Sequence, residues 1–235
     1  MVFEKLMHSK SIAQTKEMAV ALTFCGGFID AYTYIQRGHT LAAGQTGNII
    51  FFSASLANKN IMGMINRLST ILAFIFGLAI VTIIHSHTQS RYWRIFEMIP
   101  IMVVCAVVSF LPKSVPDYYV VPALAIGLSM QTGAFKKIEG LGYSNGFTSG
   151  NLKKTVIAWS EYYFDKDIDQ REPARNYTLL VIAFATGAII SAVLQKYIGA
   201  HTLLIATALL AVINSFYGYM VYKRHKEWEN KKKSI

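Results

Sequence analysis

The sequence predicts an all-α integral membrane protein with six transmembrane helices, two short half-helices and an internal two-fold repeat. Three observations lead to this fold class. Hydrophobic residues make up 53% of the chain and charged residues only 15%. The hydrophobic residues gather in six runs close to the ~20 residues that cross a bilayer. Two shorter apolar runs each follow a polar, glycine-marked stretch, and the second of these stretches echoes the first.

The six predicted spans share high hydropathy and few charges, and they occupy residues 17–36, 68–85, 96–111, 120–135, 177–194 and 202–221. The two short helices are predicted at residues 46–58 and 151–164. Pro112 and Pro116 mark a break between the third and fourth spans. The most polar part of the chain, residues 165–175, separates the second short helix from the fifth span.

The segments that flank the membrane region are basic. Residues 1–16 contain no short apolar run ahead of a cleavage site, so we expect the first span to be retained. The net charge of +10 is concentrated in the tail, residues 223–235. On a membrane protein such a tail indicates a cytoplasmic anchor near anionic lipid, and we expect no nucleic-acid partner. Cys25 and Cys105 lie within spans and suggest neither a disulfide framework nor a metal site.

Two matches in the same order indicate an internal duplication. Thr-Gly-Asn at 46–48 corresponds to Ser-Gly-Asn at 149–151, which lies 103 residues later. The Ala-Phe-x-x-Gly pattern at 73–77 recurs 110 residues later, at 183–187. The growing offset means about seven extra residues in the second half, which fit in 165–175. The predicted membrane repeats are therefore residues 17–112 and 113–222.

The orientation of the repeat depends on whether the short helices cross the membrane. If they do not, six spans make the halves inverted; if they do, eight spans make the halves parallel. Cytoplasmic loops are enriched in Lys and Arg. Six spans place nine basic loop residues inside and five outside, the five being Arg37, Lys59, Arg67, Lys113 and Lys196. Eight spans give six inside and eight outside, so the sequence favours six spans, with both termini cytoplasmic in either arrangement.

The candidate site is the polar stretch at residues 26–48 together with its echo. Asp30 lies within a span, where a charged side chain is energetically costly, and this cost suggests that Asp30 has a function. The alternative is that Asp30 lies at a hydrated helix end or pairs with Arg37. Residues 38–45 would enter the membrane as extended chain, and the following half-helix would return, which is how many transporters build a midplane site. Simple helix capping by Thr46 or Thr148 is the alternative for these motifs. The predicted substrate-binding residues are Asp30, Gln45, Thr46, Gly47, Asn48, Gln131, Thr148, Ser149, Gly150 and Asn151.

Motifs for catalysis are absent from the sequence. There is no Gly-x-Ser-x-Gly elbow, no His-Glu-x-x-His and no phosphate-binding loop. We therefore expect no enzyme, no cofactor and no ATP-driven pump. The small-residue pairs Gly27/Ala31, Ala73/Gly77 and Ala183/Gly187 are four apart, and this spacing predicts helix-packing faces.

The sequence resembles the YoaK-type family of uncharacterised bacterial integral membrane proteins. The resemblance rests on Gly26-Gly27, Asp30-Ala31 and Thr46-Gly47-Asn48, with Gln131 and Ser149-Gly150-Asn151 in the second half. It implies a multi-pass protein of the plasma membrane, and it supplies no substrate.

These observations favour a secondary transporter, or a facilitated pathway, for a small polar or anionic solute. The expected partners are the lipid bilayer and that solute, and a homodimer is allowed. Two alternatives remain open: a non-transporting membrane scaffold or subunit, and a membrane-embedded enzyme.

Overall fold

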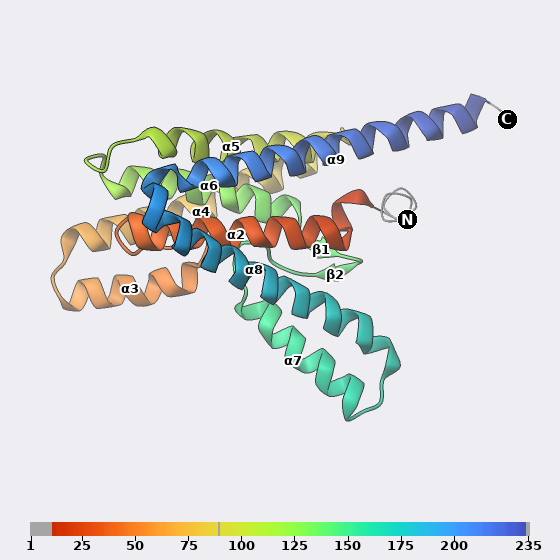
Figure 1. The fold of residues 1–235 in the computed structure, drawn as a ribbon, viewed down its shortest axis with the longest axis horizontal. Coiled ribbons are helices and arrows are strands. Elements are labelled where there is room, and N and C mark those ends of the chain that lie inside the picture. The colour runs from red at the N-terminus through yellow and green to blue at the C-terminus, as the bar shows by residue number, and fades with distance from the viewer. Residues whose placement is uncertain (1–10, 89, 234–235) are drawn as a thin grey trace.

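A computed structural model describes residues 11–88 and 90–233, and most of them are helical (Figure 1). The expected N-terminal segment lies mostly outside the described residues. Each predicted span or short helix corresponds to a helix of the structure. The helices are α2 (Lys16–Gln36), α3 (Gln45–Ala57), α4 (Ile61–His87), α5 (Trp93–Phe110), α6 (Asp117–Ala134), α7 (Ser149–Tyr163), α8 (Arg171–Ile198) and α9 (Thr202–Lys233).

Short elements complete the chain. Single 3-10 turns lie at η1 (Ile12–Gln14), η2 (Ile168–Gln170) and η3 (Gly199–His201). The glycine-rich stretch after α6 forms a small antiparallel hairpin of β1 (Lys137–Ile138) and β2 (Leu141–Gly142), which the sequence analysis did not predict. Gly140, at the hairpin turn, has φ +88°, a conformation that glycine adopts without strain. The basic tail continues α9 without a break to Lys233.

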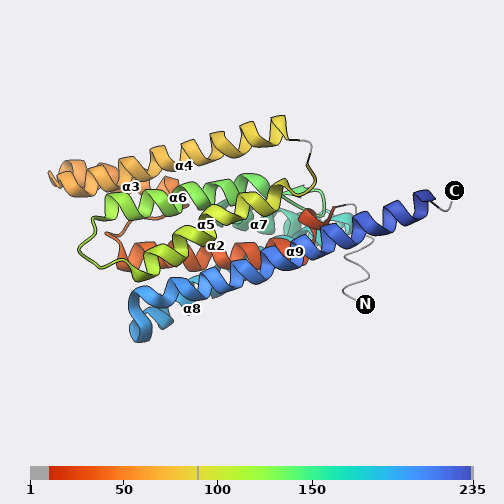
Figure 2. The ribbon, with the colours of Figure 1, turned by 90° about the horizontal axis from the view of Figure 1, so that it is seen from above.

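The long helices alternate in direction (Figures 1 and 2). α2, α5 and α8 run one way, whereas α4, α6 and α9 run the other way. The two short helices begin near the middle of the molecule and leave in opposite directions. Consequently the start of α2 and the end of α9 lie at the same end of the molecule.

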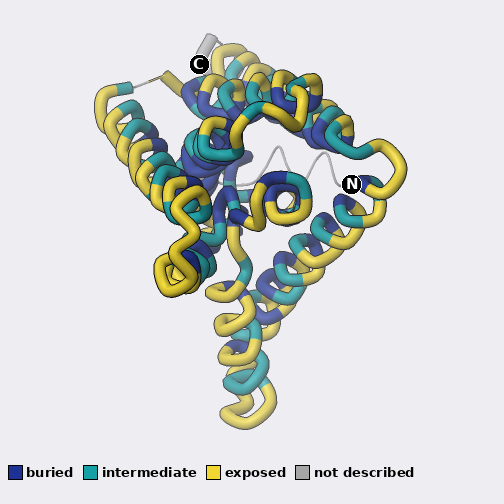
Figure 3. The backbone as a smooth tube through the Cα atoms, turned by 90° about the vertical axis from the view of Figure 1, so that its left-hand side faces the viewer, coloured by how far each residue is buried: buried dark blue, intermediate teal, exposed yellow. Residues whose placement is uncertain are grey.

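The core surrounds α2 and α6. α2 packs along α8, α4 packs along α6, and α5 packs against both α6 and α9. Figure 3 shows that the buried residues gather inside this bundle, while the α3–α4 and α7–α8 pairs carry much of their surface outward. α2 and α6 are therefore the two helices most enclosed by protein.

Glycine permits the closest of these contacts, between α2 and α8. A Cβ at Gly27 would overlap the carbonyl oxygen of Phe184, and a Cβ at Gly187 would overlap the carbonyl oxygen of Phe24. The two glycines thus make reciprocal backbone contacts across one interface. This confirms the predicted helix-packing role for Gly27 and Gly187.

The outer surface is apolar, as expected for lipid-facing helices. On α4 alone the exposed side chains include Leu72, Ile75, Phe76 and Ile83. Among the described residues, four stretches are long and apolar enough to cross a membrane, namely Lys16–Gln36, Ile61–His87, Trp93–Phe110 and Ile168–Asn230. The last of these stretches contains α8 and most of α9. The chain is an all-α membrane protein.

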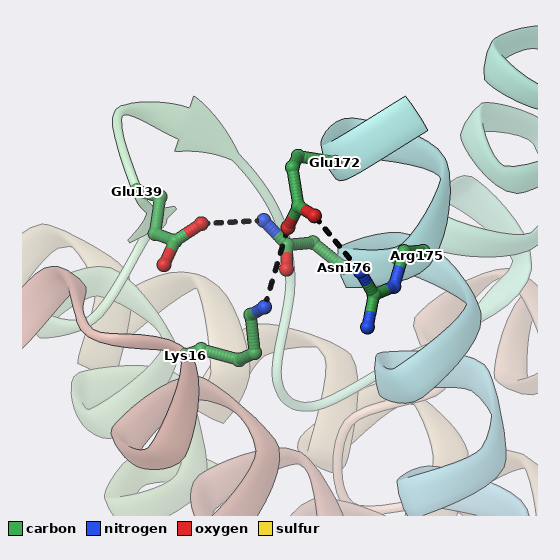
Figure 4. A network of polar contacts seen from close by, with 5 residues as sticks. All are labelled: Lys16, Glu139, Glu172, Arg175 and Asn176. Carbon is green, nitrogen blue, oxygen red and sulfur yellow. Dashed lines mark hydrogen bonds and ion pairs between the residues drawn. The ribbon is translucent and has the colours of Figure 1, made fainter. Parts of the chain in front are cut away.

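A polar network ties the hairpin to the starts of α2 and α8 (Figure 4). Lys16 Nζ lies 3.5 Å from Glu172 Oε2, and Arg175 Nη1 lies 2.9 Å from Glu172 Oε1. The Asn176 amide donates to Glu139 Oε2 at 2.8 Å. The network fixes one end of the α2–α8 interface.

Candidate functional site

Two segments outside the helices and strands, residues 37–44 and 143–148, lead into the short helices, and each is fixed by an asparagine. We call them the extended segments, although residues 37–39 form a turn in which Gly38 and His39 have φ +63° and +51°. The Leu41 N–H donates to Asn48 Oδ1 at 2.9 Å, and Asn48 Nδ2 donates to the Leu41 carbonyl at 2.7 Å. In the second half, the Ser144 N–H donates to Asn151 Oδ1 at 3.3 Å, and Asn151 Nδ2 donates to the Ser144 carbonyl at 2.7 Å. In both halves the asparagine therefore clamps the residue seven positions before it.

The two extended segments meet at the centre of the molecule. A Cβ at Gly146 would lie 3.0 Å from the Cβ of Ala43, and a Cβ at Gly26 would overlap the Asn145 carbonyl oxygen. Positions 43 and 146 have the same 103-residue separation as the two asparagines. Backbone of irregular structure is thus enclosed by protein, as membrane depth requires.

Asp30 holds the first of these segments in place. Its carboxylate is buried in α2, and Oδ1 accepts the Ala43 N–H at 2.7 Å. The next residue back, Ala42, donates its N–H to the Thr33 hydroxyl at 3.2 Å. Arg37 does not pair with Asp30, because its Nη1 lies 3.7 Å from Asp117 Oδ1 at the start of α6. Asp30 therefore lies inside the bundle and contacts backbone amides.

A cavity of about 850 Å³ opens where the short helices begin. Six of the predicted site residues line it: Asp30, Gln45, Thr46, Gly47, Thr148 and Ser149. The rest of the lining is mainly apolar and comes from α2, α4, α8 and the two extended segments; it includes Tyr34, Leu41, Ile71, Phe74, Ile75, Leu78, Phe147 and Phe184. The structure thus brings the two halves of the predicted site to one cavity.

The polar residues at this cavity differ in whether their side chains are already hydrogen-bonded to the protein. Gln45 donates to the Ala42 carbonyl at 2.9 Å and accepts from Asn48 at 2.9 Å, so its amide is engaged by the protein. The buried Thr148 hydroxyl has no hydrogen-bond partner in the described structure and does not cap α7, although Thr148 occupies the N-cap position. α3 likewise has no side-chain cap, because its N-cap residue is Gly44. The helix starts at the cavity therefore keep amide N–H groups that no side chain caps.

The remaining predicted residues lie outside the cavity lining. Asn48 and Asn151 are buried in their clamps, and Gly150 has open space around it. Gln131 is buried in a separate polar cluster, where its amide donates to Asn145 Oδ1 at 3.4 Å. The Thr132 hydroxyl donates to the same oxygen at 2.9 Å, and Asn145 Nδ2 donates to the Phe135 carbonyl at 3.0 Å.

Asn145 was missed by sequence reasoning. It sits in a glycine-rich turn, where asparagine is common for local reasons, so the pattern around it carried no signal. Only its contact with α6 shows that it organises the second extended segment.

Among the described residues, no group of three or more His, Cys, Asp or Glu side chains is placed to hold a metal ion.

The model of a family described as a protein of unknown function (DUF1275) matches residues 18–215, which span almost the whole helical bundle. The chain belongs to the DUF1275 family. The matched region contains both extended segments, both short helices and all the lining residues of the cavity. The similarity therefore covers most of the chain and is not confined to a single motif.

A curated relative is similar over most of the chain. It is the UPF0700 transmembrane protein YoaK of Bacillus subtilis (strain 168), which is 26% identical over 184 residues, covering 74% of this chain and 81% of YoaK. The resemblance to a YoaK-type membrane family, expected from the glycine-marked motifs, is confirmed. No solved structure matches the chain.

Proposed function

We propose that this DUF1275 protein is a secondary transporter, or a facilitated pathway, for a small solute, and that it acts without catalysing a chemical reaction. The observation that carries the proposal is the cavity of about 850 Å³ at which Asp30 and the starts of both short helices converge. Uncapped helix starts present partial positive charge and favour polar or anionic groups. The proposal includes an inverted repeat with six spans.

Reciprocal packing supports the repeat. If α2, α3, α4 and α5 correspond to α6, α7, α8 and α9, each helix runs opposite to its counterpart (Figures 1 and 2). The pairing of α2 with α8 then mirrors the pairing of α6 with α4. The two asparagine clamps add a match at the level of single hydrogen bonds.

The same arrangement supports six spans and half-helices. α3 and α7 start at the centre and each leaves toward the end from which the next long helix returns, so neither crosses the bundle. The stretch that contains α8 and α9 counts as two helices, and α6 crosses while enclosed by other helices. Together with α2, α4 and α5, these make six long helices that cross the membrane. In this orientation the start of α2 and the basic end of α9 face the cytoplasm, and the protein belongs in the plasma membrane.

The lining restricts the class of solute. Its walls are mainly apolar, whereas its polar groups come from Asp30, Thr46, Ser149 and the helix starts. A solute that fits carries one polar or anionic group and a small apolar body, because burying further polar groups against these walls is unfavourable.

Uptake by proteoliposomes tests this function. We would offer radiolabelled monocarboxylates and alcohols with two to eight carbons (a range chosen for the cavity, on the order of hundreds of Å³). Wild-type protein should take up at least one of them above empty liposomes, and Thr46→Val and Asp30→Asn should lose that uptake. Thr207→Val, a matched change on α9 away from the cavity, should retain it. Uptake that is indifferent to both cavity variants would remove the cavity from the mechanism.

One observation favours a second function, a membrane scaffold or subunit. Gln45, Asn48 and Asn151 direct their amides to the protein itself, as residues that only shape the backbone would. A solute that binds the folded state raises its stability. If no solute in the uptake series raises the unfolding temperature, the scaffold is the better account.

A further inference from the structure

A second cavity, of about 430 Å³, lies between the start of α5 and the far part of α9, at the end of the molecule that holds the start of α2. Its charged and aromatic lining consists of Arg91, Arg94, Tyr217, Arg224, His225 and Trp228, which we call the arginine pocket. We propose that the arginine pocket binds a phosphate group, as the headgroup of an anionic phospholipid or as a soluble phosphate. This inference does not depend on the transport proposal.

The helical spacing of α9 presents one stripe to the pocket. Tyr217, Arg224 and Trp228 are separated by seven and four residues, so they lie on one face of the helix. His225 lies beside this stripe and lines the same pocket. The two arginines of α5 and its preceding turn complete the pocket from the opposite side.

Arg94 is held in place by three neighbours. Its Nε donates to the Ala134 carbonyl at the end of α6, at 2.9 Å, and its guanidinium lies 4.4 Å from the centre of the Trp93 ring. The Tyr217 hydroxyl lies beside the same guanidinium. A guanidinium that is already oriented loses little entropy when it binds an anion, and its fork of donors matches phosphate oxygens.

Arg91 is oriented through a histidine. Its Nη1 lies 2.7 Å from His225 Nδ1, and because arginine can only donate, the imidazole proton is on Nε2. Nε2 lies 3.2 Å from Glu229, so the imidazole accepts from the arginine and donates to the carboxylate. The acidic charge of Glu229 therefore meets the histidine and not the pocket directly.

The charge of the lining is strongly positive. Among the residues that the structure describes, the lining contains three arginines and no Asp or Glu. α5 also begins here with neither an acidic residue in its first turn nor a side-chain cap, which adds to the positive potential. An anion with several oxygens complements these three guanidinium groups. Glu227, which interacts electrostatically with Arg224, lies outside the lining.

The position of the pocket suits a lipid headgroup. Trp228 and Tyr222 are 56% and 57% exposed on α9, as aromatic side chains at a membrane–water interface are. This end is the predicted cytoplasmic end, where basic pockets between transmembrane helices bind anionic headgroups. A soluble phosphate compound could reach the same donors from the water side.

The test uses the full-length protein in a neutral detergent and follows its unfolding temperature. Phosphatidylglycerol is compared with phosphatidylcholine, and sodium phosphate with sodium chloride at equal ionic strength. The variants are Arg91→Gln and Arg224→Gln. Lys226→Gln is the matched control, because it removes the same charge from exposed α9 surface outside the lining. Bound phosphatidylglycerol is also counted by native mass spectrometry, so that lipid binding can be compared even for a variant of low stability.

We expect phosphatidylglycerol to raise the unfolding temperature of the wild type and of the control. Each pocket variant should need at least about tenfold more lipid for the same rise in unfolding temperature. The same pattern with sodium phosphate alone would support the pocket and assign it to a soluble phosphate. An equal response of all four proteins would overturn the proposal, since general surface charge would then explain it. Absence of any response to lipid and phosphate would overturn it as well.

Discussion

Replacing Asn48 by alanine tests the role that the structure gives to the Gly-Asn motif. The change removes two hydrogen bonds, of 2.9 and 2.7 Å, to the N–H and carbonyl of Leu41, and a third, of 2.9 Å, to Gln45 Oε1. A buried backbone group left without a partner costs about 1–3 kcal/mol. Leu41 is only partly buried, so we expect Asn48→Ala to lower the free energy of unfolding by about 2–4 kcal/mol.

The assay is reversible unfolding of the full-length protein in mixed detergent and SDS micelles, followed by circular dichroism. Asn151→Ala should also destabilise, but somewhat less, because one of its two bonds is 3.3 Å long. Asn58→Ala at the exposed end of α3 is the control and should change stability by less than about 0.5 kcal/mol. The reasoning is refuted if Asn48→Ala matches this control, since the clamp would then contribute nothing to the fold.

Three further predictions concern packing, charge and topology. Gly187→Ala should destabilise by about 1–3 kcal/mol, because its Cβ would overlap a carbonyl of α2, whereas Gly150→Ala, with open space around it, should be neutral or stabilising in the same unfolding assay. The pKa of the Glu172 carboxyl, which desolvation raises, is held below its usual value by its two basic neighbours. The contribution of Glu172 to stability is therefore present above pH ~4.3 and is lost as pH falls through the lowered pKa. This step in stability should be absent from the pH–stability profile of Glu172→Gln. Single cysteines in a cysteine-free background should react with an impermeant thiol reagent on intact cells at position 59 but not at position 92, and the reverse pattern would contradict six spans.

Much of the fold follows from local sequence properties. The hydropathy runs correctly placed every long helix, because a span must satisfy its own backbone and cover itself with apolar side chains. The short helix at 45–57 was also predictable, since an apolar run of thirteen residues after a glycine-marked turn is too short to span the membrane. α9 extends to Lys233, beyond the predicted end of its span, because a helix can continue into water where hydropathy no longer reports it.

Only part of the candidate site could be predicted from the sequence. Asp30, Thr46 and Thr148 stood out as polar residues at unusual places, and they do reach one cavity. Asn48 stood out for the same reason, but its amide is used by the backbone seven residues earlier. A sequence shows that a polar residue needs a partner in the membrane; it does not show whether that partner is a solute or the chain itself.

The sequence by itself determined the class of protein, the positions of its helices and the two motifs that echo each other. These properties depend on residues close together in the chain. Only the tertiary structure decided that Arg37 meets Asp117, that Asn145 organises the second segment and that three arginines from α5, its preceding turn and α9 form one pocket. Such contacts join residues far apart in the sequence, and their geometry is set by how the helices cross, which no local pattern encodes.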